Sequence, residues 1–286
     1  MIGIIDIGSN SVRLALSADG KTLYKRLKTT RLGEGLSLTG KLSAAAIERT
    51  ASAVYDFYAQ AKNDGADKVY AFATAAVRAS SNGSEFTKYT KERYGIDVDV
   101  ISGEIEARIA LLGALGNSDG GIIDLGGASC EVTVRKGGSV VYTKSVDVGA
   151  VRLLDECGRD RDKLERYIGA KLKNYGQFDA SKYEMYGVSG TATTLAAVKH
   201  KLKDYDPAIV HGTVLTVDDV GAFADKFFSM TVEEIKNLGE VVMWRADVIA
   251  GASLFLYRLM QYMNIPKMTV SENDNLEGYL IYKGGI

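Results

Sequence analysis

The stretch Gly3-Ile4-Ile5-Asp6-Ile7-Gly8-Ser9-Asn10-Ser11 decides the fold, because the chain repeats it 118 residues later as Gly121-Ile122-Ile123-Asp124-Leu125-Gly126-Gly127-Ala128-Ser129. The register between the two copies holds as far as the next turn, where Asp19-Gly20 corresponds to Gly137-Gly138. A short apolar run that ends in Asp-x-Gly is typical of a buried strand leading into a loop. Both turn dipeptides accept the positive φ of a two-residue hairpin. The repeat therefore predicts two duplicated lobes, each beginning with three antiparallel strands.

The composition fits a protein with two cores and excludes several partners. At 286 residues the chain is long enough for two domains. Its 35 lysines and arginines nearly balance 36 acids, so no basic field favours nucleic acid or an anionic membrane as a partner. Cys130 and Cys157 lack the spacing of a disulfide scaffold or a zinc site. The N-terminus has no basic leader, and no window approaches the ~20 apolar residues that span a bilayer. We expect a cytoplasmic protein.

The first lobe alternates helices and strands, which predicts an α/β fold with helices covering a sheet. Ser43 can cap a helix in which Ile47, Val54, Tyr58 and Ala61 share one face. Further along, strands are expected at 68–74 and 98–101, and helices at 84–94 and 104–115.

The second copy of the repeat follows a polar, glycine-rich stretch at 117–121, which is the best candidate linker. We therefore expect one lobe over 1–117 and another over 118–286. A last helix near 274–286 is expected to pack back on the first lobe. Other helices of the second lobe are expected at 148–157, 160–173, 191–200, 217–228 and 245–263.

The two Asp-x-Gly loops have the residues of a phosphate cradle. Glycine allows close approach of the backbone to a ligand, and main-chain N–H groups can bind phosphate oxygens. The alternative for one isolated loop is a tight turn with an Asx hydrogen bond, but two unrelated turns have no reason to share nine positions. The predicted phosphate-binding residues of these loops are Gly8, Ser9, Asn10, Ser11, Gly126, Gly127, Ala128 and Ser129.

Carboxylates beside these loops suggest a magnesium site. Asp124 and Glu131 lie in the second copy, and Asp6 lies in the first. Magnesium prefers one or two protein carboxylates together with phosphate oxygens. The alternative for Glu131 is an exposed strand residue. Cys130 is expected to be a small buried side chain.

A third loop, Val188-Ser189-Gly190-Thr191, joins a strand to a helix that begins with hydroxyl residues. The free N–H groups and the dipole of a helix N-terminus favour an anion. Ser and Thr also cap helices that bind no ligand. We predict that Gly190 and Thr191 bind phosphate because this is the third such loop in the chain.

Glu104 and Glu106 occupy the first turn of the predicted helix at 104–115, where acids complement the helix dipole. Because they are two residues apart, they point to different faces, so one can be solvated while the other looks into a cleft between the lobes. A carboxylate there can deprotonate water for attack on phosphorus. Arg78 follows a strand, and its guanidinium can bind phosphate. Arg31 is a similar candidate.

The chain resembles the exopolyphosphatase/guanosine pentaphosphate phosphohydrolase (Ppx/GppA) family, within the actin, heat-shock chaperone and sugar kinase superfamily. The resemblance covers essentially the whole chain. Besides the two loops, the matching segments are residues 31–36, 73–78, 101–108, 149–153, 189–193, 211–215 and 245–251.

The resemblance implies two duplicated ribonuclease H-like lobes with the active site in the cleft between them. It implies magnesium-dependent release of terminal orthophosphate from inorganic polyphosphate, or conversion of pppGpp to ppGpp. By the same resemblance, Glu106 is the catalytic glutamate, Asp124 and Glu131 are the metal-associated acids, and Arg78 binds phosphate. Related proteins are often dimers, so a homodimer is possible.

The chain departs from the family pattern at three positions. Ala128 replaces a third glycine of the second loop, and Asp274 and Leu276 stand where the family usually has glycine and arginine. The His-Asp-rich C-terminal domain of long members is also missing from the sequence, which makes processive action on long polyphosphate less secure. Two alternatives stay open: an ATP-dependent kinase of the same superfamily, and a non-catalytic sensor of polyphosphate or alarmone. No residue pattern ranks polyphosphate against pppGpp.

Overall fold

The computed structural model describes residues 1–284, which form two compact units. One unit contains residues 1–113 and the C-terminal segment from Asn273 onward, and the other contains residues 114–272. The division therefore falls inside helix α5 (Gly103–Leu115) and not at the expected boundary of 117 and 118. Gly120 and Gly121 of the expected linker belong to strand β6 (Gly120–Leu125). The expected last helix is α14 (Asn275–Tyr282), and residues 285–286 lie outside the described part of the chain.

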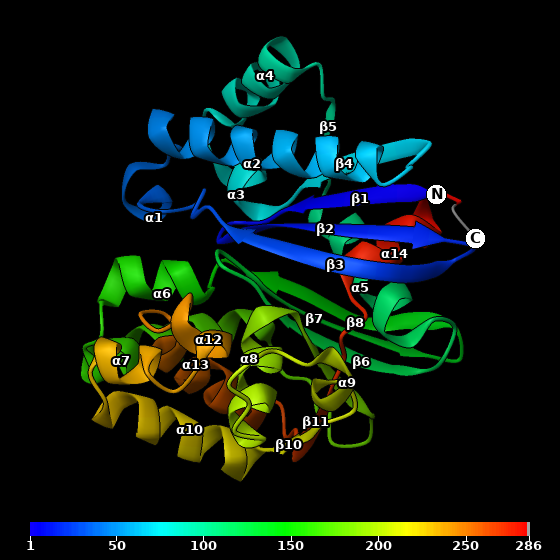
Figure 1. Cartoon of the computed structure of the whole chain (residues 1–286). Coiled ribbons are helices and arrows are strands. Elements are labelled where there is room, and N and C mark those ends of the chain that lie inside the picture. Colours follow the sequence, from blue (N-terminus) through cyan, green and yellow to red (C-terminus); the bar gives the residue numbers. More distant parts are fainter. Residues whose placement is uncertain (285–286) are drawn as a thin grey trace. The chain divides into compact units, whose positions relative to one another are not determined.

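Each unit is built on one sheet, and the two sheets repeat the same topology (Figure 1). In the first unit the strand order is β3-β2-β1-β4-β5; in the second it is β10-β11-β9-β6-β7-β8. The first three strands of each copy are antiparallel, and the next two are parallel to the first. The second sheet adds β10 at its edge. The predicted α/β fold with duplicated lobes is confirmed. The strands are β1 (Ile2–Ile7), β2 (Ser11–Ala18), β3 (Lys21–Thr29), β4 (Lys68–Ala73), β5 (Val98–Val100), β6 (Gly120–Leu125), β7 (Cys130–Lys136), β8 (Ser139–Val146), β9 (Met185–Val188), β10 (Val214–Thr216) and β11 (Lys267–Val270).

Strand alternation places the two faces of the first sheet in different cores. Ile5 and Ile7 of β1 pack in the core under helix α2 (Ala44–Asn63), whereas Ile4 packs in a second core with residues of α14. Successive side chains of a strand point to opposite faces. Asp6 therefore shares the face of Ile4, the face that α14 covers.

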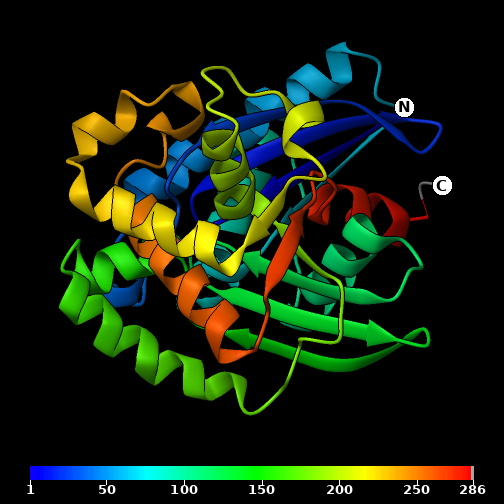
Figure 2. The ribbon, with the colours of Figure 1, turned by 90° about the horizontal axis from the view of Figure 1, so that it is seen from below.

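The long helices follow the prediction closely. The side chain of Ser43 caps α2 and accepts a hydrogen bond from the Ala46 N–H at 3.2 Å. The other expected helices are α4 (Gly83–Tyr94), α6 (Ala150–Cys157), α7 (Arg161–Leu172), α8 (Ser189–Lys199), α10 (Val217–Ser229) and α13 (Ile249–Tyr262). Helices α10 and α13 pack against each other, the yellow and orange ribbons of Figure 2. Short helices without a sequence prediction are α1 (Leu36–Thr39), α3 (Ala75–Ala79), α9 (Pro207–Val210), α11 (Val232–Lys236) and α12 (Glu240–Met243).

Within residues 1–284, every helix is too short or too polar to cross a membrane.

Candidate functional site

The two predicted phosphate loops have the same backbone geometry. The Gly8 N–H donates to the Ser11 carbonyl at 3.0 Å, and the Gly126 N–H donates to the Ser129 carbonyl at 3.0 Å. Each loop thus closes with the same hydrogen bond at the same place in the repeat. The strands that flank the loops also pair in equivalent register, because Asp6 lies opposite Arg13 and Asp124 lies opposite Glu131. The sequence repeat is therefore a repeat of local structure.

The first loop, residues 8–11, is held by backbone hydrogen bonds from residues 30–33, which follow β3. The N–H groups of Thr30 and Arg31 donate to the Asn10 carbonyl, and the Gly33 N–H donates to the Ser9 carbonyl at 2.9 Å. Side chains of Ser9, Asn10 and Ser11 are buried. Backbone hydrogen bonds of this kind leave the loop little freedom to change shape, as a preformed anion cradle requires.

Glu106 and Arg78, two of the predicted site residues, contact each other in the first unit. The Arg78 Nη1 donates to Glu106 Oε2 at 2.7 Å and to the Ile101 carbonyl at 3.0 Å. Helix α3 carries Arg78 in its last turn, and α5 carries Glu106 in its first. Glu106 is 5% exposed, whereas Glu104 faces solvent. A buried carboxylate fixed by a guanidinium has a defined orientation, which a general base needs.

Asp6, predicted as a metal ligand, is instead held by arginine. Arg13 Nε donates to Asp6 Oδ2 at 3.1 Å, and Arg13 Nη2 also pairs with that oxygen. Burial raises the pKa of Asp6, and Arg13 opposes this shift. The sequence prediction missed this ion pair, although the register of the hairpin places the two residues opposite each other.

The second unit brings two carboxylates together at the equivalent positions. Asp124 and Glu131 are 5% and 2% exposed, and Ser145 Oγ donates to Glu131 Oε1 at 2.6 Å. Two carboxylates at directly opposed strand positions can contribute ligands to the same cation. Within residues 1–284, no group of three or more His, Cys, Asp or Glu side chains is arranged for a metal. A pair of carboxylates nevertheless suits magnesium, which keeps most of its ligands as water and phosphate oxygens. The exposed alternative for Glu131 is wrong.

The third predicted loop lies against the second. Ser189 Oγ donates to the Leu125 carbonyl at 3.1 Å, and Thr191 Oγ1 lies 3.5 Å from the same carbonyl oxygen. Ser189 has φ of 65°, an uncommon left-handed conformation for a residue with a side chain. The structure thus places the N-terminus of α8 at the end of β6, where the loop at 126–129 begins. Strained residues of this kind are often found at ligand sites.

Arg245 is a site candidate that was not predicted from the sequence. Its guanidinium lies directly on Gly190, so closely that any Cβ at position 190 would overlap it. Arg245 lies in segment 245–251, which matches the family pattern, and this match was the one feature of the sequence that could have indicated a role for it. The absence of a side chain at Gly190 thus leaves the space that the Arg245 guanidinium occupies.

The loop at 126–129 is supported by the start of α6. The N–H groups of Ala150 and Val151 donate to the carbonyls of Gly126 and Gly127 at 2.9 and 2.8 Å. A Cβ at Gly149 would lie 2.5 Å from the Gly127 carbonyl, so the close approach requires glycine. Cys130 follows the loop, and burial raises the pKa of its thiol well above the ordinary value. It is a buried structural side chain, as predicted.

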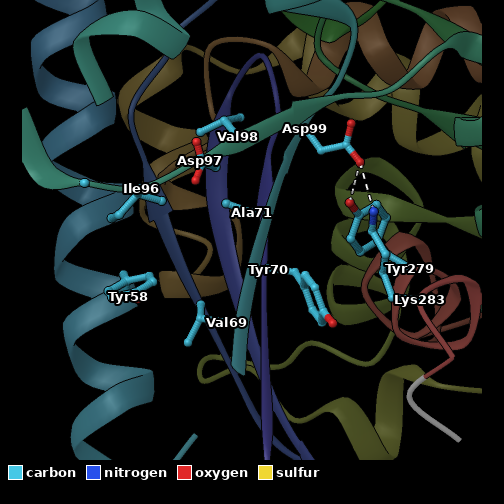
Figure 3. A pocket seen from close by; sticks show the side chains of 11 residues that line it. Tyr58, Val69, Tyr70, Ala71, Ile96, Asp97, Val98, Asp99, Tyr279 and Lys283 are labelled. Carbon is cyan, nitrogen blue, oxygen red and sulfur yellow. Dashed lines mark hydrogen bonds and ion pairs between the residues drawn. The ribbon is translucent and has the colours of Figure 1, made fainter. Parts of the chain in front are cut away.

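A pocket of about 330 Å³ lies elsewhere on the first unit (Figure 3). Its lining comes from α2, β4, the strand β5 and α14, and it contains none of the predicted site residues. Asp99 accepts hydrogen bonds from the Tyr279 hydroxyl at 2.8 Å and from Lys283 at 3.1 Å at its edge. Two acids, Asp97 and Asp99, line the pocket with one lysine, so its lining does not favour a phosphate.

Comparison with known proteins supports the family resemblance. The Ppx/GppA phosphatase family model matches residues 14–283. Exopolyphosphatase 2 of Mycobacterium tuberculosis is 29% identical, and the match covers 99% of this chain and 98% of that protein. A guanosine-5'-triphosphate,3'-diphosphate pyrophosphatase of Photobacterium profundum is 27% identical over 98% of this chain. The chain spans 58% of that protein, and 46% of a bifunctional 3-dehydroquinate synthase/phosphatase of Fusobacterium nucleatum that is 29% identical.

Solved structures agree with these relatives. The Aquifex aeolicus PPX-GPPA enzyme is 30% identical and has a TM-score of 0.78, with 98% of each chain covered. An exopolyphosphatase-like protein has a TM-score of 0.90 at 26% identity, covering 99% of this chain and 98% of that chain.

Proposed function

Because the chain belongs to the Ppx/GppA phosphatase family, we propose that it releases terminal orthophosphate from inorganic polyphosphate, from the 5′ end of pppGpp, or from both. The observation that carries this proposal is the buried Glu106 carboxylate, fixed by Arg78 at 2.7 Å. The names of the relatives, exopolyphosphatase and guanosine pentaphosphate pyrophosphatase, support these two substrates.

Glu106 is the proposed general base. It takes a proton from a water molecule as the water oxygen bonds to the terminal phosphorus and the phosphoanhydride bond breaks, so that orthophosphate and a shortened chain leave. Arg78 fixes the orientation of this carboxylate by its hydrogen bond to Oε2. Arg78 is also the proposed contact to a phosphate oxygen, and a guanidinium has enough donors for both roles. General base catalysis of this kind contributes about 10²–10⁴-fold.

Asp124 and Glu131 are the proposed holders of magnesium. When bound there, the ion would offset the negative charge of the phosphate oxygens. Asp6 is proposed as a secondary contact to the magnesium ion and not as a main ligand, because its carboxylate already accepts a hydrogen bond from Arg13.

The loops of each unit are proposed to bind phosphate oxygens. Phosphoryl transfer passes through a loose transition state, so positioning and charge stabilisation supply most of the rate. The rigid hydrogen bonds of Gly8 and Gly126 supply such positioning without reorganisation. The proposed phosphate-binding residues are Gly8, Ser9, Asn10, Ser11, Arg78, Gly126, Gly127, Ala128, Ser129, Gly190 and Thr191.

A phosphate-release panel tests the proposal. Tripolyphosphate, long-chain polyphosphate, pppGpp and ATP are each incubated with the protein, with and without magnesium. Magnesium-dependent release of orthophosphate from polyphosphate or pppGpp, without an acceptor, is the expected result. Binding of these anions without release would favour a sensor, and transfer from ATP that needs an acceptor would favour a kinase. A homodimer and a cytoplasmic location stay predictions.

Glu106→Gln is the sharpest single change. We expect kcat to fall by about 10²–10⁴-fold, with KM nearly unchanged, because the amide keeps the shape and can still contact Arg78. Glu104→Gln is the matched control, since it removes the same charge from the same helical turn at an exposed position. Equal activity of the two variants would refute the role of Glu106.

A further inference from the structure

Arg13 lies at the centre of a charge cluster in the first unit, and the proposed reaction gives Arg13 no role. All three of its guanidinium nitrogens donate to carboxylates: Nε and Nη2 to Asp6, and Nη1 to Asp274. The side chains of Asp6 and Asp274 are 7% and 6% exposed, and that of Arg13 is 19% exposed. The first unit therefore carries a largely buried group of three charges beside its phosphate loop.

The position of Asp274 is fixed by the start of α14. Asp274 is the N-cap residue, and its Oδ1 accepts from the Leu276 N–H at 3.0 Å, which leaves Oδ2 directed at Arg13. Glu277 Oε2 in turn accepts from the Asp274 N–H at 3.0 Å, completing a capping box. Lys25 pairs with Glu277 at 2.9 Å. Asp274 thus adds a second carboxylate to the Asp6 and Arg13 pair.

The second unit has no counterpart to this arrangement at the equivalent strand positions. Glu131 stands where the first unit has Arg13, and it pairs in register with Asp124. The first copy thus has its own cation where the second has two acids. Arg13 Nε and Nη2 contact Asp6, so without Asp274 the Arg13 Nη1 would lose the carboxylate that it contacts. With Asp274, an anion that approaches Nη1 meets a second carboxylate.

We propose that Asp274 is a specificity-determining residue that holds Arg13 away from the anionic substrate and so weakens the binding of polyanions to the first phosphate loop. The proposal deepens the proposed function, on which its substrate class rests. Burial raises the pKa of Asp274, but the charges of Arg13 and Lys25 and the hydrogen bonds to this carboxylate together outweigh burial and lower the pKa overall. Asp274 is therefore ionised at neutral pH and pairs with Arg13. The contact spans 261 residues of sequence and ties the C-terminal segment to β2.

Asp274→Asn tests the proposal, because asparagine is nearly isosteric and remains a good N-cap. We measure the Kd of inorganic tripolyphosphate by isothermal titration calorimetry without metal, and the KM for polyphosphate with magnesium. Both constants should fall, on the order of tenfold, the effect of removing one charge at short range in a partly buried site. The value of kcat should change less than twofold. An unchanged or higher Kd, in a variant whose circular dichroism and thermal midpoint show a folded protein, would overturn the proposal.

A double-mutant cycle distinguishes restraint of Arg13 by Asp274 from a general electrostatic effect of the Asp274 charge on the anion. If Asp274 holds Arg13 away from the anion, Arg13→Gln weakens tripolyphosphate binding more in the Asp274→Asn background than in the wild type. Equal losses of affinity in both backgrounds would leave only a general effect of charge and contradict the proposed restraint of Arg13 by Asp274.

Glu277→Gln is the control for charge alone, since Glu277 contacts Thr22 and Lys25 in the same cap. It should change the Kd less than twofold, and a gain equal to that of Asp274→Asn would also contradict the proposal. Because binding is measured without turnover, the cycle remains informative if no substrate of the panel is hydrolysed.

Discussion

At the residue scale, the two copies of the repeat differ in the residue that lies opposite the aspartate that both copies share. Position 13 holds arginine and the equivalent position 131 holds glutamate, each directly opposite an aspartate on the neighbouring strand. Asp6 pairs with Arg13. Asp124 and Glu131 form a buried acidic pair, which is the donor set that magnesium prefers. The difference is visible in the sequence alignment of the two copies, and it favours the second unit as the metal-binding one.

Glu131→Gln should therefore weaken divalent cation binding. We expect the affinity for Mn²⁺, followed by electron paramagnetic resonance as a probe for the proposed magnesium site, to fall about 10–100-fold, because one of the two proposed carboxylate ligands becomes a neutral amide. The thermal midpoint without metal should stay the same or rise, since a buried like-charge repulsion is removed. Glu184→Gln, at an exposed position of the same unit, is the control. Undiminished Mn²⁺ binding by Glu131→Gln would place the metal elsewhere.

The Arg13 and Asp274 pair also predicts a dependence of stability on pH. The pKa of Asp274 is lowered in the folded protein, so the ion pair stabilises the fold above about pH 4 and this contribution is lost as pH falls through the lowered value. The pKa of Asp6 is raised, so its protonation acts in the opposite direction, relieving the cost of burial as pH falls. Asp274→Asn isolates the first effect. Its deficit in unfolding free energy, about 1.5–3 kcal/mol at pH 7 for a hydrogen bond to a charged group, should shrink below pH 4 in urea titrations. A deficit that is constant from pH 7 to 3 would contradict this origin.

The sequence predicted single residues well where local spacing determined them. Glu104 and Glu106 were expected on different faces, and the structure exposes the first and buries the second. Contacts between distant segments were not predictable in the same way. Nothing in the periodicity around Asp274 indicates that α14 brings its N-cap to Arg13, because that contact depends on how the C-terminal segment packs.

At the element scale, the sequence predicted the long helices and most strands, and it missed five short helices. Hydrophobic periodicity needs several turns to be recognised. Helix α3 has only five residues, yet it carries Arg78 and orients it toward Glu106. A helix of this length is held by its tertiary contacts and not by its own propensity. The position of Arg78 was therefore predictable only as "after a strand".

Gly149 tests how far the phosphate loop depends on the start of α6. A methyl group at Gly149 would lie 2.5 Å from the Gly127 carbonyl, so Gly149→Ala must displace the loop at 126–129. We expect a lower thermal midpoint and a weaker affinity for tripolyphosphate. Gly169→Ala is the matched control, because Gly169 is an exposed residue inside α7 with open space around it. That variant should gain about 0.5–1 kcal/mol from helix propensity and bind normally. Normal binding by Gly149→Ala would show that the loop does not require this close approach.

At the scale of the whole molecule, the chain forms one continuous unit and one discontinuous unit. Residues 114–272 form their unit from a single stretch, whereas the first unit needs the segment from Asn273 onward. The reason lies in the apolar side chains of α14. Leu276, Tyr279 and Leu280 are nearly fully buried, and Tyr279 stacks on Phe72 of β4 with ring centroids 4.2 Å apart. The sequence predicted that a last helix packs back on the first lobe, but the depth of its burial follows only from the structure.

This arrangement predicts different behaviour of the two units as separate fragments. The fragment 114–272 should fold alone, with a cooperative thermal transition, because its core is built from its own residues. The fragment 1–113 should not, because it loses three buried side chains worth about 1.5–3 kcal/mol each, a sum comparable with the whole stability of a small domain. Addition of a peptide of residues 273–284 should restore its folding, measured by circular dichroism and by amide exchange of β1. A peptide with Tyr279→Ala should restore it less, since burial of this aromatic ring and its stack on Phe72 are lost. Stable folding of 1–113 without peptide would mean that α14 is an accessory of the first unit and not part of its core.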